Sequence, residues 1–308
     1  MRVFVAGATG VIGRRAVEEL LAAGHEVTAA ARTPEKAALL SASGAVPVTV
    51  DLFDPASARA AVAGHEAVVN LATKIPPVAK TFLPGAWKEN DRIRRELSRT
   101  LVDAALAGGA EAYVQESIVF TYPSMDDAWI DEDVPLAPAK YVRSTLEAEA
   151  QARRFTEAGG TGVALRFGQF YAADTGHTRA MADMVRKGRA PATKPAGERY
   201  ASSIHVDDAA GAVAAALTVP AGVYNVVEDE PVTRRVFFDL LADALGVPHP
   251  KLLPGWLGAL MGSVGETFSR SQRCSNRRFR AASGWAPRYP SVREGFPAVV
   301  AELRNAET

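Results

Sequence analysis

The stretch Gly7-Ala8-Thr9-Gly10-Val11-Ile12-Gly13 follows an apolar run at residues 2–6 and opens a helical pattern that reaches Ala23. An apolar run, a glycine-rich turn and a helical pattern in this order predict a strand, a tight turn and a helix. The glycines allow a sharp turn, a close approach of phosphate to the backbone and tight packing of the helix on the strand. The stretch therefore predicts a dinucleotide-binding turn, with a plain tight turn as the alternative. Its candidate binding residues are Gly7, Thr9, Gly10, Val11, Ile12 and Gly13.

Further along the chain, short apolar runs rich in Val, Ala and Leu alternate with helical patterns. Runs without polar alternation are typical of strands that helices cover on both faces. This rhythm predicts an α/β fold with a doubly wound parallel sheet of the Rossmann type. The predicted strands span residues 2–6, 26–31, 45–50, 67–71, 112–115 and 162–167, and the clearest helices span residues 11–23, 55–63, 87–106 and 141–158.

The regular alternation ends at Phe167, and the segments after it are richer in Gly and Pro. We therefore expect a dinucleotide-binding Rossmann domain over residues 1–167. Residues 168–308 are expected to form mainly a smaller C-terminal substrate-binding lobe, while residues 201–227 pack back on the Rossmann core. Open α/β sheets bind ligands at the carboxyl ends of their strands, so the lobe should cover that edge.

Composition narrows the class of protein. The chain has 308 residues, equal numbers of basic and acidic residues at 35 each, and a single cysteine, Cys274. A formal net charge of zero argues against nucleic-acid and anionic-membrane partners, and no apolar stretch reaches the roughly 20 residues that span a bilayer. The first residues show no signal-peptide pattern, and no cluster has metal-ligand spacing. We expect a cytoplasmic protein whose partner is a small molecule and which uses no metal.

The residues after the second predicted strand bear on the choice of cofactor. In NAD-binding proteins of this architecture, an acidic residue at this point binds the ribose hydroxyls. This chain instead has Arg32 followed by Thr33, and Arg14 directly follows the last glycine of the turn. A guanidinium suits a 2′-phosphate through charge-assisted hydrogen bonds. The sequence therefore favours NADP(H) over NAD(H), the alternative being that Arg32 is a solvated loop cation.

Other motif residues occur at matching points: Asp51-Leu52, Asn70-Leu71-Ala72, Asn90, Ser117, Tyr141 and residues 204–208. With the glycine turn, they resemble the short-chain dehydrogenase/reductase superfamily in its extended NAD(P)-dependent epimerase/dehydratase branch. The resemblance implies that residues 166–169 lie beside the nicotinamide or the substrate. It also implies that His205 and Asp207 belong to a lobe-packing segment, although we favour a structural role, since a His beside two Asp residues at a helix start is readily explained as a cap. Further cofactor contacts implied are Asp51, Leu52, Leu71, Ala72, Thr73, Tyr141 and Arg166.

The family's proton-transfer pair is a Tyr and a Lys four residues later, and this chain has Tyr141 with Thr145 in place of the Lys. The resemblance implies that Tyr141 donates a proton, that Ser117 hydrogen bonds the substrate oxygen, and that Thr145 contacts a ribose hydroxyl; the alternative for Tyr141 is packing at a helix start. Because Thr145 carries no charge, a replacement positive charge must come from elsewhere, with Lys74, Arg166 and the oxidised nicotinamide itself as candidates. A tyrosine with an ordinary pKa of about 10 donates a proton more readily than it accepts one at neutral pH, which favours reduction.

These features predict an NADP-dependent oxidoreductase that reduces a small carbonyl compound by hydride transfer. Two alternatives stay open: an NADP(H)-binding sensor or regulator without turnover, and a nucleotide-sugar epimerase or dehydratase. Glu116 is a rival acid or base, or an ordinary carboxylate at a strand end. The aromatic residues Phe170, Tyr171, Trp256 and Phe268 are candidates for a substrate wall or for core packing. Arg270, Arg273, Arg277, Arg278 and Arg280 form a solvated face, a homodimer contact or a site for an anionic substrate group.

Overall fold

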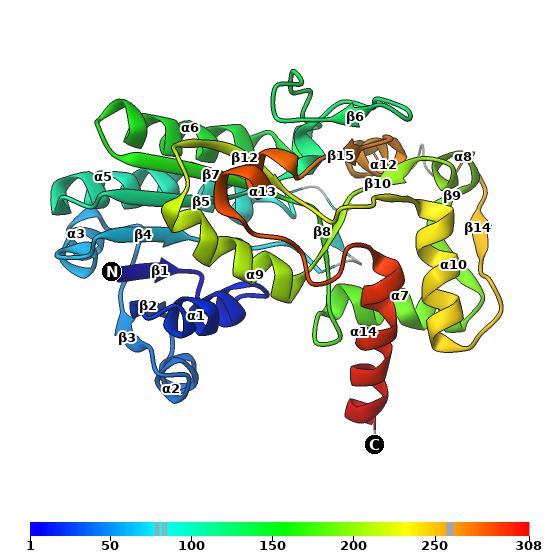
Figure 1. The fold of residues 1–308 in the computed structure, drawn as a ribbon, viewed down its shortest axis with the longest axis horizontal. Helices are drawn as coiled ribbons and strands as arrows, with labels where there is room; N and C mark the ends of the chain where they lie inside the picture. The colour runs from blue at the N-terminus through cyan, green and yellow to red at the C-terminus, as the bar shows by residue number, and fades with distance from the viewer. Residues whose placement is uncertain (78–79, 82, 84, 257–261, 308) are drawn as a thin grey trace.

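The computed structural model describes residues 1–77, 80–81, 83, 85–256 and 262–307. At its centre is a seven-stranded sheet with the order β12-β7-β5-β4-β1-β2-β3, in which all neighbouring strands are parallel (Figure 1). The predicted doubly wound parallel sheet is therefore confirmed. The strands are β1 (Arg2–Ala6), β2 (Glu26–Ala31), β3 (Val46–Thr49), β4 (Ala67–Asn70), β5 (Ala112–Ile118), β7 (Thr161–Phe167) and β12 (Gly222–Val226).

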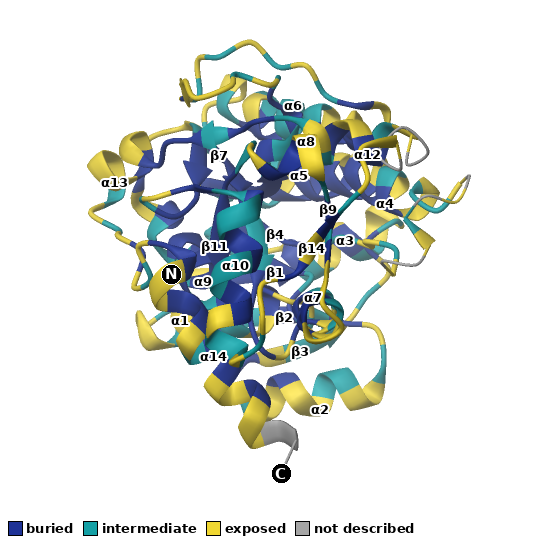
Figure 2. Cartoon of the chain, turned by 90° about the vertical axis from the view of Figure 1, so that its right-hand side faces the viewer, coloured by how far each residue is buried: buried dark blue, intermediate teal, exposed yellow. Residues whose placement is uncertain are grey.

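Helices cover both faces of this sheet because successive strand residues point to opposite sides. In β1, Val3 and Val5 join the apolar cluster beneath one group of helices, whereas Phe4 and Ala6 join the cluster beneath the other. The first group includes α1 (Gly13–Ala22), α2 (Pro34–Ala42) and α9 (Val206–Ala215), and the second includes α3 (Pro55–Val62), α5 (Ser98–Gly108) and α6 (Ser144–Glu157). Figure 2 shows the buried strands between partly exposed helices.

Two predicted helices are divided in the structure. The helix expected over residues 87–106 is a continuous run of α4 (Lys88–Arg92), a π-helical segment η2 (Ile93–Leu97) and α5. The helix expected from Tyr141 begins as the 3₁₀ turn η4 (Lys140–Val142), and α6 follows it. Strand β5 runs to Ile118, beyond the predicted end at residue 115, so Glu116 and Ser117 are strand residues.

A second apolar cluster lies beside the sheet, on the right of Figure 1. Its members come from residues after β7, and Phe237, Phe296 and Leu241 are buried at its centre. Residues 206–226 return to the sheet, since α9 packs against α1 and β12 pairs with β7. In the described part of the chain, no helix combines the length and the apolar character needed to cross a membrane. The cluster is built by β9 (Arg189–Thr193), β14 (Lys251–Leu253), α7 (Gly176–Arg186), α10 (Arg234–Leu245) and α14 (Val292–Glu307).

Candidate cofactor and active site

The glycine turn links β1 to α1 and faces the end of β4. Gly7 has a φ of +79°, and a Cβ on it would lie 2.5 Å from the carbonyl carbon of Leu71. A Cβ on Gly13 would overlap the carbonyl oxygen of Gly7. A Cβ on Gly10 would meet only that oxygen, at 3.1 Å. Packing within the chain therefore requires glycine at two of these positions, whereas at Gly10 it leaves open space.

This open space fits the phosphates of a dinucleotide. Helix α1 begins at Gly13, and its N-cap residue Ile12 makes no side-chain hydrogen bond to the first turn. Among the described residues, the backbone N–H groups of Val11, Ile12 and Gly13 make no hydrogen bond, so they stay available to an anion, which the helix dipole also attracts. Gly10 and Val11 are exposed and Thr9 is half-buried, so the turn presents accessible backbone to a ligand.

The other cofactor candidates follow the ends of the parallel strands, which meet at one edge of the sheet. The Asn70 side chain organises this edge: its Oδ1 accepts a hydrogen bond from the backbone N–H of Ala72 at 3.2 Å, and its Nδ2 donates to Gln115 Oε1 at 2.9 Å. The remaining candidates differ in exposure. Asp51 is exposed, Ala72 and Thr73 are half-buried, and Leu52 and Leu71 are buried.

Arg32 follows the end of β2 and is exposed. Within the described residues, its guanidinium makes no hydrogen bond or ion pair, so it is free to bind a ligand. Its neighbour Thr33 is engaged as the N-cap of α2, where its hydroxyl accepts a hydrogen bond from Lys36 N. Arg32 is thus an uncommitted cation at the strand end where the sequence predicts a 2′-phosphate.

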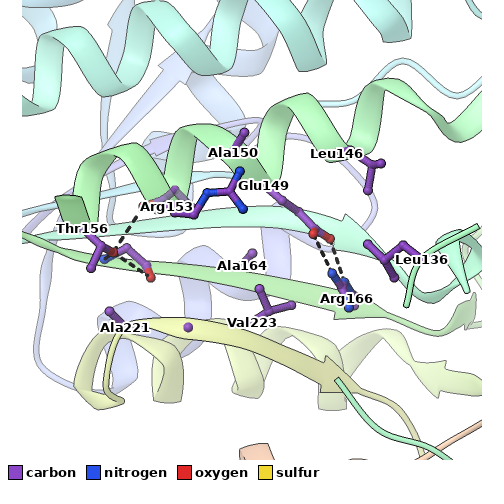
Figure 3. A pocket seen from close by; sticks show the side chains of 13 residues that line it. Leu136, Leu146, Glu149, Ala150, Arg153, Thr156, Ala164, Arg166, Ala221 and Val223 are labelled. Carbon is purple, nitrogen blue, oxygen red and sulfur yellow. Dashed lines mark hydrogen bonds and ion pairs between the residues drawn. The ribbon is translucent and has the colours of Figure 1, made fainter. Parts of the chain in front are cut away.

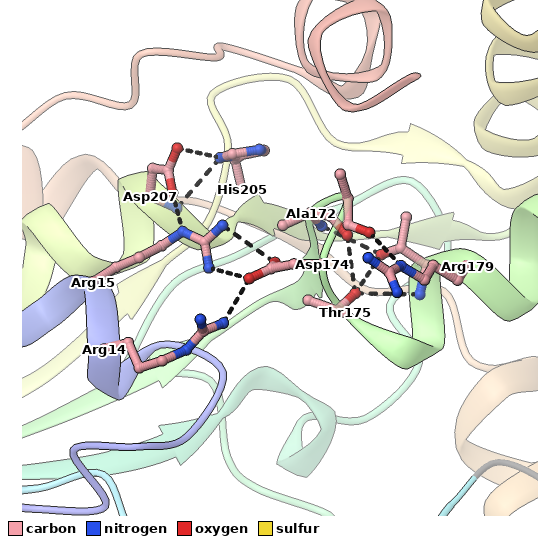
Figure 4. A network of polar contacts seen from close by, with 10 residues as sticks. Arg14, Arg15, Ala172, Asp174, Thr175, Arg179, His205 and Asp207 are labelled. Carbon is pink, nitrogen blue, oxygen red and sulfur yellow. Dashed lines mark hydrogen bonds and ion pairs between the residues drawn. The ribbon is translucent and has the colours of Figure 1, made fainter. Parts of the chain in front are cut away.

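Arg14 forms an ion pair with a residue from the C-terminal half of the chain (Figure 4). Its Nη2 lies 2.6 Å from Asp174 Oδ2, and Arg15 binds both Asp174 and Asp207. His205 completes this network as the N-cap of α9, accepting a hydrogen bond from Asp207 N. The cap interpretation of His205 is therefore confirmed, and the network ties the start of α1 to the segments around residues 174 and 205.

Tyr141 lies in an apolar surrounding. Its ring centroid is 4.7 Å from that of Trp87, and Thr267 of α12 (Gly262–Ser269) lies near its hydroxyl. Burial raises the pKa of Tyr141 to about 12, although Arg94 and Arg270 act in the opposite direction. Tyr141 therefore stays protonated at neutral pH and can donate a proton. The apolar neighbours are Trp87, Ile118, Ala139, Val142, Val264 and Phe268.

The structure does not bring Ser117 to Tyr141. The Ser117 hydroxyl donates to Glu149 Oε1 of α6 at 2.5 Å, while the next residue, Ile118, is the β5 residue that packs in the Tyr141 cluster. The reason is the alternation of side chains along β5, which sends residues 117 and 118 to opposite sides. Glu149 lies on α6, one helical turn after Thr145, and no motif in the sequence marks it as a partner of Ser117.

Arg166 also lies elsewhere than expected. It pairs with Glu149 and donates to the Tyr122 hydroxyl at 2.7 Å. The pair lines a groove of about 450 Å³ between α6, β7 and β12 (Figure 3). Two strands, β5 and β4, separate β7 from β1, so this groove is remote from the glycine turn. The expectation that Arg166 supplies a free cation to the nicotinamide does not hold in this structure.

The position of the missing lysine is occupied by a buried hydroxyl. Thr145 is fully buried, and its Oγ1 has no hydrogen-bond partner among the described residues. Lys74, the other candidate cation, is exposed, and its backbone N–H donates to Asn90 Oδ1 at 2.9 Å. Glu116, the rival acid or base, is paired with Arg94, whose Nη2 lies 3.2 Å from Glu116 Oε1.

Arg94 is a buried residue near Tyr141 that is not among the candidates predicted from the sequence. The side chain is 1% exposed, although it is a permanent cation. A signal was present: Arg94 precedes Leu97 and Leu101 by three and seven residues, so it falls on the apolar stripe of its helix. A charge on such a stripe needs a buried partner or a ligand.

The remaining candidates are mostly satisfied within the chain. Of the aromatic residues, Phe268 lies in the Tyr141 cluster, whereas Tyr171 is in the second apolar cluster and Trp256 is 66% exposed. The arginines after residue 269 bind groups of the same chain, which argues against a shared anion site. Arg270 pairs with Glu266, Arg278 with Asp133 and Arg280 with Asp229, Arg273 stacks on Trp129, and Arg277 bonds Ser275.

The parallel sheet and the glycine turn at its first strand define a dinucleotide-binding protein of the Rossmann class. A family model described as NAD(P)H-binding matches residues 7–220, and the chain belongs to this family. The predicted membership of an NAD(P)-binding family is confirmed, and solved epimerase structures share the fold of the chain.

One relative resembles the chain over nearly its whole length. It is the 3-diazoavenalumate denitrifying reductase of a Streptomyces species, which is 35% identical over 96% of this chain and 99% of that protein. Human epimerase family protein SDR39U1 with NADPH has the same fold, with a TM-score of 0.78, 24% identity, and coverage of 98% of this chain and 100% of that one. Thermus thermophilus UDP-glucose 4-epimerase in complex with NAD has a TM-score of 0.80 at 24% identity, and the match covers 99% of this chain and 100% of that one.

Proposed function

We propose that the protein is an NADP(H)-dependent reductase that acts on a small organic substrate. The observation that carries the cofactor choice is Arg32, an exposed guanidinium without a partner in the described chain, at the end of β2. The whole-length similarity to a reductase supports the reaction type. When bound, NADPH supplies the hydride that reduces the substrate.

The first candidate substrate is a small carbonyl compound. A carbonyl that accepts a hydride also needs a proton on its oxygen. Tyr141 is suited to supply that proton, since burial keeps its hydroxyl protonated. The apolar neighbours Trp87 and Phe268 exclude water from this hydroxyl and offer flat surfaces to an apolar substrate.

The second candidate is an aryl diazonium compound, favoured by the name of the similar reductase and by the missing lysine. A diazonium carbon that takes up a hydride gives R–H and releases N₂, so the carbon–nitrogen bond breaks without a proton donor. Because this reaction needs no proton donor, replacing the lysine by Thr145 would not lower its rate.

The test is a screen of aldehydes, ketones, aryl diazonium salts and nucleotide sugars with NADPH, monitored by cofactor absorbance and by product analysis. We expect NADPH consumption with one of these classes and none with nucleotide sugars. Tight NADPH binding without consumption by any member of the panel would favour the sensor. Turnover of a nucleotide sugar would favour the epimerase or dehydratase instead.

A further inference from the structure

Four buried polar side chains without complete hydrogen bonding occur on α4, η2 and α6. The atoms without a partner among the described residues are Asn90 Nδ2, Arg94 Nε and Nη1, Ser144 Oγ and Thr145 Oγ1. Each residue is at most 1% exposed. Buried donors are nearly always satisfied in folded proteins, so several orphans in one region indicate a ligand that brings acceptors.

Two packed segments bring these groups together. Asn90 and Arg94 lie about one turn apart on the helix formed by α4 and η2, and Ser144 and Thr145 open α6. Segment η2 packs against α6, and an ion pair of 2.8 Å between Arg95 Nε and Glu147 Oε1 joins them.

The same strand end receives both helices. Arg94 reaches Glu116 of β5, and Glu149, one turn beyond Thr145 on α6, reaches the adjacent residue Ser117. Arg94 and Glu149 thus both reach the carboxyl end of β5, and Thr145 lies one helical turn before Glu149. Arg94 is also near enough to Tyr141 for its charge to act on the Tyr141 hydroxyl.

Glu116 determines which part of the guanidinium is available. Its two carboxylate oxygens lie 3.2 and 3.5 Å from Arg94 Nη2, so Nε–H and Nη1–H remain free. Because the carboxylate balances the charge, the pair offers oriented donors more than a bare positive charge. Such donors can hold ribose hydroxyl oxygens, but they lower the pKa of a neighbouring tyrosine less than an unpaired lysine would.

The other candidate cations either form ion pairs within the chain or are exposed to solvent. Arg166 is bound to Glu149 and Tyr122, and Arg270 is bound to Glu266 and to two backbone carbonyls. Lys74 is exposed. Within the described chain, Arg94 is the buried cation beside Tyr141 that has unused donors.

Building on the proposed cofactor, we propose that Arg94 takes the role of the lysine that Thr145 replaces. Its free Nε–H and Nη1–H, together with the Thr145 hydroxyl, hydrogen bond the nicotinamide-ribose half of the dinucleotide, while Glu116 holds the guanidinium in place. This contact positions the nicotinamide next to Tyr141 without requiring a charged residue on α6.

The test compares two ligands by fluorescence or calorimetric titration: NADPH, and adenosine 2′,5′-bisphosphate, which has the 2′-phosphate but no nicotinamide half. In the double variant Arg94→Met/Glu116→Gln, which leaves no unpaired buried charge, we expect the Kd of NADPH to rise about tenfold or more. The Kd of the bisphosphate should stay within about twofold. Adding Thr145→Lys to the double variant should restore part of the NADPH affinity.

Arg95→Met is the matched control, because Arg95 is the exposed neighbour of Arg94 and should affect neither ligand. Unchanged NADPH affinity in the double variant, or equal weakening of both ligands, would overturn the role of Arg94. If the unmodified protein fails to bind NADPH, the proposed function itself is wrong. Should the double variant not fold, Arg94→Lys replaces it, and the same selective loss of NADPH affinity is required.

Discussion

The Arg166 guanidinium and the Glu149 carboxylate form a two-bonded ion pair between β7 and α6, with Nε 2.8 Å from Oε1 and Nη2 2.7 Å from Oε2. The side chains are 5% and 9% exposed. Fork-like pairing of this kind fixes both side chains, and Ser117 adds a third bond to the same carboxylate. The pair therefore clamps α6 onto the sheet, and Arg166 is a structural residue in this fold.

We expect Arg166→Met to destabilise the protein by about 3–5 kcal/mol, because it leaves the Glu149 carboxylate buried without its cation. The free energy of unfolding in urea measures this loss. Arg95→Met, which removes a half-exposed partner of Glu147, should cost no more than about 1 kcal/mol. Equal losses in the two variants would show that burial does not distinguish these ion pairs.

Arg32→Ala should weaken NADPH binding by about one to two powers of ten, since a charge-assisted hydrogen bond contributes about 1.5–3 kcal/mol. NADH has no 2′-phosphate, so its affinity should not change. Titration of both cofactors against both proteins measures the difference. NADH binding that equals or exceeds NADPH binding in the unmodified protein would reject the cofactor assignment.

Gly10→Val should abolish NADPH binding while the protein still folds. Within the chain, a Cβ at Gly10 meets only the Gly7 carbonyl oxygen at 3.1 Å, but the branched side chain would fill the space proposed for phosphate. Gly13→Val should instead destabilise the fold, because its Cβ would overlap that same oxygen. Circular dichroism and thermal unfolding separate the two effects. NADPH affinity retained by a folded Gly10→Val variant would place the cofactor elsewhere.

Tyr141→Phe should lower carbonyl reduction by about 10²–10⁴-fold and leave NADPH affinity nearly unchanged, because the phenol acts on the substrate oxygen. Reduction of a diazonium substrate should continue, since that reaction takes no proton from the phenol. Steady-state kinetics with each substrate class, together with NADPH titration, measure the contrast. Carbonyl turnover that survives the substitution would remove Tyr141 from the mechanism.

Stability should depend on pH through Glu228, which accepts a hydrogen bond from Tyr171 at 2.5 Å. Burial is the main cause that raises the pKa of Glu228 to about 8, and Asp208 and Glu294 add to the rise. The folded state therefore binds this proton more tightly than the unfolded state. The resulting stabilisation is complete below pH about 4.5 and is lost as pH rises through about 8.

Glu228→Gln keeps an acceptor for Tyr171 and cannot ionise, so it should remove this part of the pH dependence. Urea unfolding at several values between pH 5 and pH 9 should show a smaller decline in the variant than in the unmodified protein. Parallel declines would mean that other groups produce the pH dependence.

The sequence was sufficient to predict those parts of the structure that depend on residues close together in the chain. Residues 2–13 combine an apolar strand, glycines at positions of close approach and a helix start, and these properties depend on neighbours in the chain. The same holds for β2 and β7, whose bounds the apolar runs predicted to within one residue. Arg32 belongs to this group too, since its place after a strand is readable from the sequence.

The direction of Ser117 required more than its position in the chain. Its motif match suggested a place beside Tyr141, but β5 continues to Ile118, and the alternation of its side chains sends Ser117 to Glu149. The partner of Arg166, Glu149 on α6, likewise cannot be predicted from the position of Arg166 in the sequence. The contacts of such a side chain depend on the length of its strand and on the helix that packs against it.

Backbone propensity and apolar periodicity act over a few residues, so the succession of strands and helices along the chain, the glycine turn and Arg32 after β2 can be predicted from the sequence. The pairing of Arg94 with Glu116 and of Arg166 with Glu149 depends on the tertiary packing. These pairs join residues far apart in the chain, and a buried charge takes its partner from whichever element the packing places opposite it.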